Sequence, residues 1–82
     1  GRAYPNPFNP TTSIRFELRE SGVIDLTVFD VTGRAVHSLA AGAFAAGTHE
    51  ILFEAGDLPS GLYVYRLVTD SGTASAPVVL LK

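Results

Sequence analysis

The feature that most constrains this 82-residue chain is a two-residue alternation of apolar and polar side chains in several short segments. Ile14, Phe16 and Leu18, for example, alternate with polar residues, as expected of a half-buried strand. No segment shows a sustained helical period. We expect strands over residues 13–18, 23–30, 34–39, 48–53, 62–69 and 73–81. Turn residues separate these segments, so the sequence predicts an all-β, immunoglobulin-like antiparallel β-sandwich of about seven strands.

Residues between the predicted strands indicate how the chain turns. Asp30-Val31-Thr32-Gly33 is typical of a tight turn in which Gly33 takes a positive φ. Segment 34–39 alternates less cleanly, which predicts a bulge or an edge position. Segment 40–47 is rich in small residues, and we expect it to be a loop that Phe44 attaches to the domain.

The last two predicted strands carry clear positional signals. Segment 62–69 has apolar residues on both faces, which predicts a central strand. Pro77 interrupts segment 73–81 and confines it to an edge or a bulge, because proline cannot donate a ladder hydrogen bond. The run Leu58-Pro59-Ser60-Gly61-Leu62-Tyr63 is typical of a tyrosine corner, in which the Tyr63 hydroxyl binds the backbone just upstream.

The first ten residues form a segment of another kind, with three prolines that each fix φ and remove a backbone donor. Tyr4 and Phe8 nevertheless provide large apolar groups, which a mere tether would not need. We therefore expect residues 1–12 to be a stiff lead-in whose aromatic side chains pack on the domain. Residues 13–82 would then form the β-sandwich.

Composition argues against several classes of partner. The net charge is -2 and only 17% of residues are charged, so the chain has no basic footprint for nucleic acid or anionic lipid. No apolar run approaches the length of a membrane span, and we expect no direct membrane insertion. The chain has no cysteine, which excludes disulfides and thiolate metal sites.

The polar residues do not indicate catalysis. His37 and His49 have no second histidine or carboxylate at metal-ligand spacing. We expect His49 to be a hydrogen-bonded histidine at the core or its rim, and His37 to be solvated. Asp30, Asp57 and Asp70 fall where aspartate commonly stabilises turns. We therefore expect neither an enzyme nor a bound cofactor or metal.

Two tyrosines leave two interpretations open. Tyr63 and Tyr65 could form a carbohydrate-binding platform, with Phe29 as a further exposed ring. Their alternation with Leu67 favours packing in the core.

Several motifs, in order along essentially the whole chain, resemble one family. These motifs are Tyr4-Pro5-Asn6-Pro7-Phe8-Asn9-Pro10-Thr11-Thr12, Leu26-Thr27-Val28-Phe29-Asp30-Val31-Thr32-Gly33-Arg34, Ala46-Gly47-Thr48-His49-Glu50, Leu58-Pro59-Ser60-Gly61-Leu62-Tyr63-Val64-Tyr65-Arg66-Leu67 and Val79-Leu80-Leu81-Lys82. The chain resembles the C-terminal sorting domains of the type IX secretion system of the Bacteroidetes and related phyla. Pro5, Asn6, Pro7, Gly33, Gly61 and Tyr63 are the positions that define the motifs.

The resemblance implies a non-catalytic sorting signal on an N-terminal cargo protein, which travels through the periplasm and outer membrane to the cell surface or beyond. Its implied partners are an outer-membrane translocon and a sortase-like peptidase. An edge strand at the end of the chain is a natural element for a receptor. The candidate recognition residues are therefore Val78, Val79, Leu80, Leu81, Lys82 and Arg66.

One departure from the family and two alternative functions accompany this interpretation. Ser75-Ala76-Pro77 stands where relatives commonly show a basic pair, which leaves Lys82 and Arg66 as the basic groups near the terminal strand. The flagellar hook-capping protein carries an immunoglobulin-like domain with related motifs, so a structural module in a surface assembly is one alternative. A carbohydrate-binding module is the other.

Overall fold

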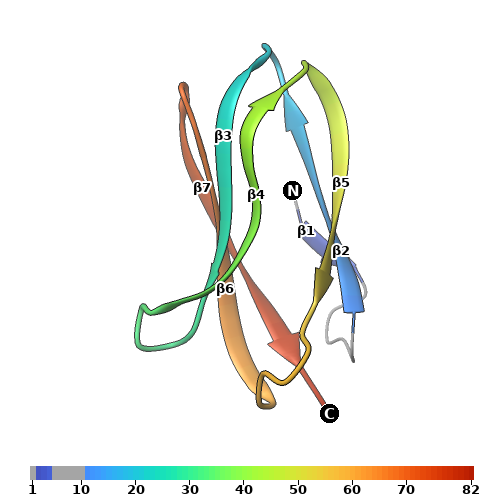
Figure 1. Cartoon of the computed structure of the whole chain (residues 1–82), viewed down its shortest axis with the longest axis vertical. Coiled ribbons are helices and arrows are strands. Elements are labelled where there is room, and N and C mark those ends of the chain that lie inside the picture. The colour runs from blue at the N-terminus through green and yellow to red at the C-terminus, as the bar shows by residue number, and fades with distance from the viewer. Residues whose placement is uncertain (1, 5–10) are drawn as a thin grey trace.

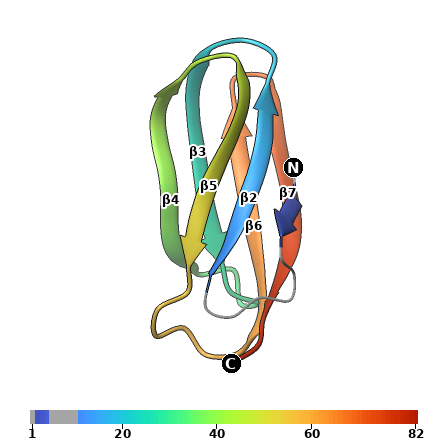
Figure 2. The same cartoon turned by 90° about the vertical axis from the view of Figure 1, so that its right-hand side faces the viewer.

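Two antiparallel sheets pack face to face in the computed structural model, which describes residues 2–4 and 11–82 (Figures 1 and 2). The strands of this part of the chain are β1 (Arg2–Tyr4), β2 (Thr11–Leu18), β3 (Gly22–Phe29), β4 (Ala35–Phe44), β5 (Gly47–Glu54), β6 (Gly61–Thr69) and β7 (Gly72–Leu80). One sheet has the order β1-β2-β5 and the other β4-β3-β6-β7. The predicted all-β sandwich is confirmed.

The position of β4 distinguishes this sandwich from the constant-type immunoglobulin arrangement, in which the fourth strand joins the sheet of the first, second and fifth. Here β4 pairs with β3. The turn between them is tight, with hydrogen bonds from the Asp30 N–H to the Arg34 oxygen (2.9 Å) and from the Gly33 N–H to the Asp30 oxygen (3.0 Å). Gly33 has a φ of 86°, as predicted. Because the chain reverses at once, β4 stays in the sheet of β3.

The loop predicted over 40–47 is wrong. β4 continues to Phe44, and Ala40 to Ala43 pair with the first half of β3. Small side chains carry little strand propensity, but the hydrogen bonds of the neighbouring strand supply what the local sequence lacks. The predicted edge position and bulge are confirmed, since β4 ends its sheet and the register shifts twice along it.

The core forms from the inward faces of both sheets, as the alternation predicts. Its buried apolar residues are Ile14, Phe16, Leu18, Ile24, Leu26, Val28, Phe53, Ala55, Tyr63, Tyr65, Val78 and Leu80. β6 is central in its sheet, as predicted. Its outer face is not covered by a further layer, however, because Leu62 is 47% exposed and Val68 37% exposed.

A tyrosine corner fixes the crossing from β5 to β6. The Tyr63 hydroxyl donates a hydrogen bond of 2.6 Å to the Pro59 oxygen, which confirms the predicted motif. The Leu58 N–H donates to the oxygen of the buried Ala55 across the same crossing (3.1 Å). These bonds hold the chain where it passes from one sheet to the other.

The N-terminal residues join the smaller sheet. β1 pairs with β2 through Arg2 opposite Arg15, Ala3 opposite Ile14 and Tyr4 opposite Ser13. Phe8, like Pro5, Asn6 and Pro7, lies outside the described residues, so packing of the lead-in aromatics stays a prediction. In the described ranges, no helix has the length and hydropathy to cross a membrane.

Tyr63 and Tyr65 provide a matched test of the corner, since each is 4% exposed on the same strand. Tyr63→Phe should lower the free energy of unfolding by about 0.5–1.5 kcal/mol, because it removes a made hydrogen bond. Tyr65→Phe should leave that free energy nearly unchanged, because the Tyr65 hydroxyl is buried without a partner among the described residues. Urea unfolding measures both. Equal losses in the two variants would contradict this role of the corner.

Asp30 provides a test by pH. Its carboxylate accepts hydrogen bonds from Thr32 Oγ1 (2.6 Å), the Thr32 N–H (2.9 Å) and the Arg34 N–H (3.1 Å). The Thr32 side chain and these backbone donors, with the nearby Arg34, hold the pKa of Asp30 below its ordinary value of 3.8.

The stability that Asp30 contributes is therefore present above about pH 4 and disappears as the pH falls through the folded-state pKa. The unfolding free energies of the wild type and Asp30→Ala should differ at pH 7 and converge as the pH falls through the folded-state pKa of Asp30. A difference independent of pH, measured by urea unfolding, would show that the carboxylate charge is not what matters.

Candidate recognition surface

The terminal strand lies at the edge of the larger sheet. β7 pairs with β6 along its whole length and is the last strand of that sheet (Figure 1). The edge position predicted from Pro77 is confirmed. An edge strand presents backbone groups on its open side, and these can pair with a further strand.

Strand alternation divides the predicted recognition residues into two groups. Val78 and Leu80 are fully buried, so their side chains hold β7 to the core. Val79 points outward, opposite Leu62 of β6, and Leu81 is 55% exposed beyond the strand. Only the second group offers side chains to a partner of the folded domain.

Lys82 ties the end of the chain to the β5–β6 crossing. Its N–H donates to the Ser60 hydroxyl (2.9 Å), and its Nζ donates to the Gly56 oxygen (2.7 Å). Both bonds are exposed to solvent. The last residues are therefore held in a defined position while they remain accessible.

Arg66 lies on the outer face of the larger sheet, away from Lys82 in the strand register. Its guanidinium covers the Phe29 ring at 4.4 Å from the ring centroid, a cation–π contact. The two basic residues predicted to contribute to recognition thus lie apart, with Arg66 on the larger sheet and Lys82 beyond its last strand.

The outer faces of the two sheets differ in chemistry. By strand register, Phe29, Val64 and Pro77 form one row across the larger sheet, and Leu62 and Val79 form a second. The outer face of the smaller sheet instead carries the charged residues Arg15, Glu17, Glu50 and Glu54. Sequence reasoning missed the apolar face, although the residues on both faces of segment 62–69 carry its signal.

The histidines take part in packing. His49 contacts the rings of Phe16 and Phe44 and hydrogen-bonds the Ala45 oxygen (2.7 Å), which confirms the predicted rim histidine. His37 is half-buried and packs edge-on against Phe53 (5.6 Å), so the prediction that it is solvated is wrong. His37 is paired with the inward-facing Val28, so its ring lies on the core side of β4 and meets Phe53.

The turn roles predicted for the aspartates are confirmed at Asp30. In the β6–β7 hairpin the hydrogen bonds come from Thr69, whose hydroxyl accepts from the Ser71 N–H (3.2 Å) and donates to the Gly72 oxygen (3.3 Å). The role of Asp57 stays a prediction. Within residues 2–4 and 11–82, no three histidine, cysteine or acidic side chains are grouped to hold a metal ion.

The carbohydrate platform required exposed tyrosines, and both are in the core. Phe29 is half-buried beneath Arg66. Burial of the tyrosine rings therefore overturns this interpretation.

Comparison with protein families decides among the remaining interpretations. The model of the secretion system C-terminal sorting domain family matches residues 2–80. The chain belongs to this family. No curated protein matches the chain significantly.

The sorting domain is thus a C-terminal signal for type IX secretion, which implies a cargo protein handled by that machinery and exported to the cell surface or outside. The family is a sorting family rather than a catalytic one. The match gives no support to a hook-capping or carbohydrate-binding role.

Leu80 and Leu81 are adjacent residues that test whether the terminal side chains divide into a buried group and an exposed group. Leu80→Ala should lower the free energy of unfolding by about 2–5 kcal/mol, because it opens a cavity in the core. Leu81→Ala should change it by less than about 0.5 kcal/mol, as is usual for surface sites. Chemical unfolding of both variants measures the difference. Similar costs would show that Leu81 is also structural.

Proposed function

We propose that the folded domain is a non-catalytic address that the type IX translocon recognises at the edge formed by β7 and the residues after it. Leu81 and Lys82, with the outward Val79 and Arg66, make the side-chain contacts. The buried side chains of Val78 and Leu80 hold the strand in place.

One observation carries this proposal. The last residues of the chain are held in a defined position and are also exposed to solvent. The side chains of Val78 and Leu80 anchor β7, and the Lys82 bonds to Ser60 and Gly56 fix the end of the chain beyond it. A partner can therefore bind terminal residues that are already ordered, which lowers the entropic cost of binding.

Family membership supports a cargo protein on the N-terminal side of the domain. The cargo protein lies on the N-terminal side and reaches the outer membrane through the periplasm. A sortase-like peptidase at the outer membrane then acts on the cargo side of the domain. We place this junction on the cargo side of β1, with residues 1–12 as a lead-in packed on the recognised body, residues 13–82.

A secretion assay tests the proposal. Residues 1–82 are fused to the C-terminus of a periplasmic reporter in a host with a type IX system, and reporter outside the cell is quantified. Combined Leu81→Ser and Lys82→Ala should lower export roughly tenfold, which corresponds to about 1.4 kcal/mol of lost recognition. The fold should be retained, because neither side chain is in the core.

The matched control carries Leu52→Ser and Arg15→Ala on the outer face of the smaller sheet. Leu52 is 56% exposed, close to the 55% of Leu81, so the two variants remove similar surface. The control should be exported like the wild type. Normal export of the terminal variant, or an equal defect in the control, would contradict recognition at β7. Truncation from Leu80 is unsuitable, because it removes a fully buried side chain.

A further inference from the structure

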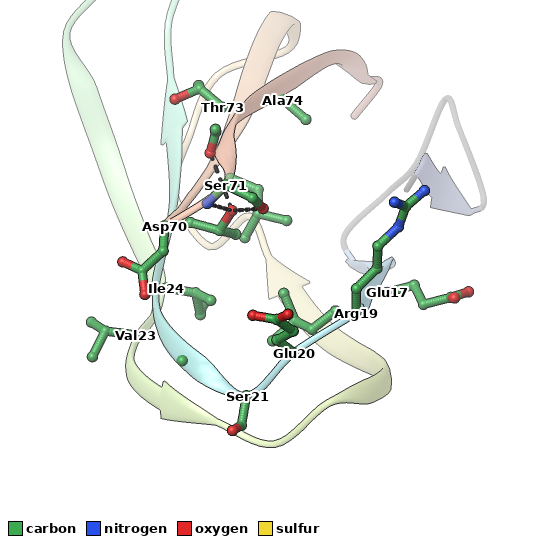
Figure 3. Close-up of a pocket in the computed structure, with 15 residues that line it drawn as sticks. Glu17, Arg19, Glu20, Ser21, Val23, Ile24, Asp70, Ser71, Thr73 and Ala74 are labelled. Carbon is green, nitrogen blue, oxygen red and sulfur yellow. Dashed lines mark hydrogen bonds between the residues drawn. The ribbon is translucent and has the colours of Figure 1, made fainter.

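The two sheets separate into a cleft at the end of the sandwich that holds the β2–β3 turn and the β6–β7 hairpin. The cleft has a volume of about 510 Å³ and lies between residues 17–24 on one side and Leu67 with residues 69–74 on the other. Figure 3 shows Glu17 and Arg19 on the first side, and Thr73 and Ala74 on the second.

The cleft is open because β1 is shorter than β2. β1 pairs with Ser13 to Arg15 only, whereas β2 continues to Leu18. On this side of β2, no described residue pairs with Phe16 to Leu18. The backbone of this segment therefore presents an open edge to which a strand can be added.

The inner face of β7 is uncovered at the same place. Ala74 pairs with the inward-facing Leu67, yet Ala74 is exposed and Leu67 is only half-buried. Farther along the same face of β7, Val78 and Leu80 are fully buried. Among the described residues, none covers this part of the core beyond Arg2, where β1 begins.

A buried polar group also lies at this opening. A smaller cavity, which shares Leu67 and Ala74 with the cleft, is lined by Phe16 and Tyr65. The Tyr65 hydroxyl is buried and has no hydrogen-bond partner among the described residues. A buried polar group without a partner usually marks a missing neighbour.

We infer that the polypeptide joining the cargo to this domain extends β1 along β2, opposite Glu17 and Leu18, and closes the cleft. The direction of the strands carries this inference. Because β1 and β2 are antiparallel, each earlier residue of β1 faces a later residue of β2. A chain that enters β1 in extended form must pass along the open edge of β2, the strand beside which β1 lies in Figure 2.

The occupant is the domain's own junction segment rather than a strand from another molecule. Membership of a C-terminal sorting family places a cargo protein before the domain. A segment joined covalently to β1 binds the edge at an effective concentration that reaches the millimolar range for short connections. A second copy or a separate peptide would have to compete with it.

The added strand must repeat the alternation of its neighbours. The residue immediately before Gly1 falls opposite Glu17 and faces solvent, and the residue before that falls opposite Leu18 and faces Leu67 and Ala74. The first position should therefore be polar and the second apolar. This inference rests on the family's domain order and not on recognition at β7.

Disulfide formation in the full-length cargo protein tests the register. The domain has no cysteine of its own, so one cysteine replaces Glu17 (Glu17→Cys) and another the residue immediately before Gly1, with any cargo cysteines changed to serine. Facing residues of antiparallel strands have Cα atoms about 4.5–5.5 Å apart, within disulfide range. Mild oxidation should give an intramolecular disulfide, detected by gel mobility and mass spectrometry.

The control pairs the same upstream cysteine with Thr48→Cys. Thr48 lies opposite Glu17 on the β5 side of β2, so it is about two strand spacings, or roughly 10 Å, from the upstream residue. That pair should not form a disulfide. Equal formation in both pairs, formation in neither, or a disulfide between two chains would each overturn the inference.

Hydrogen exchange of the cysteine-free full-length protein gives a second readout. Among the amides of Phe16 to Leu18, those that point away from β5 should exchange roughly tenfold faster or more when the three residues before Gly1 are replaced by proline, because the added strand is lost. Unchanged exchange would overturn the inference. Neither measurement involves export, so failure here is distinct from failure of translocon recognition.

Discussion

The contact between the inward faces of the two sheets is what the rest of this structure depends on. The chain has no cysteine to cross-link it, so burial of apolar side chains carries the stability of the domain. Phe53 from one sheet and Leu26, Val28, Val78 and Leu80 from the other are fully buried. A terminal strand that takes part in this contact becomes ordered whenever the domain is folded.

This coupling explains how one strand serves both stability and recognition. Successive side chains of a strand face opposite sides, so β7 gives Val78 and Leu80 to the core and Val79 to the surface. Hydrogen bonds then fix where the end of the chain lies. The Tyr63 corner holds the β5–β6 crossing, and Lys82 bonds to that crossing. The sorting surface is therefore a property of the folded domain more than of a linear tail.

The two ends of the sandwich differ in how completely they are closed. Near the C-terminus, the corner and the Lys82 bonds join β6 and the end of the chain to the β5–β6 crossing. At the opposite end, a short β1 leaves an open edge on β2 and a cleft beneath it. A domain attached to a cargo through β1 would be completed at that end by the polypeptide that connects the two.

The sequence by itself determined the fold class, the inward residues of the strands, the Asp30 to Gly33 turn and the tyrosine corner. These features depend on local alternation and on residues whose chemistry suits a single backbone arrangement. Only the tertiary structure decided that β4 extends through Ala40 to Ala43, since pairing with β3 outweighs weak local propensity. It also decided which candidate residues reach the surface and which part of β2 has no described partner on its β1 side, because both depend on strand neighbours that are distant in the sequence.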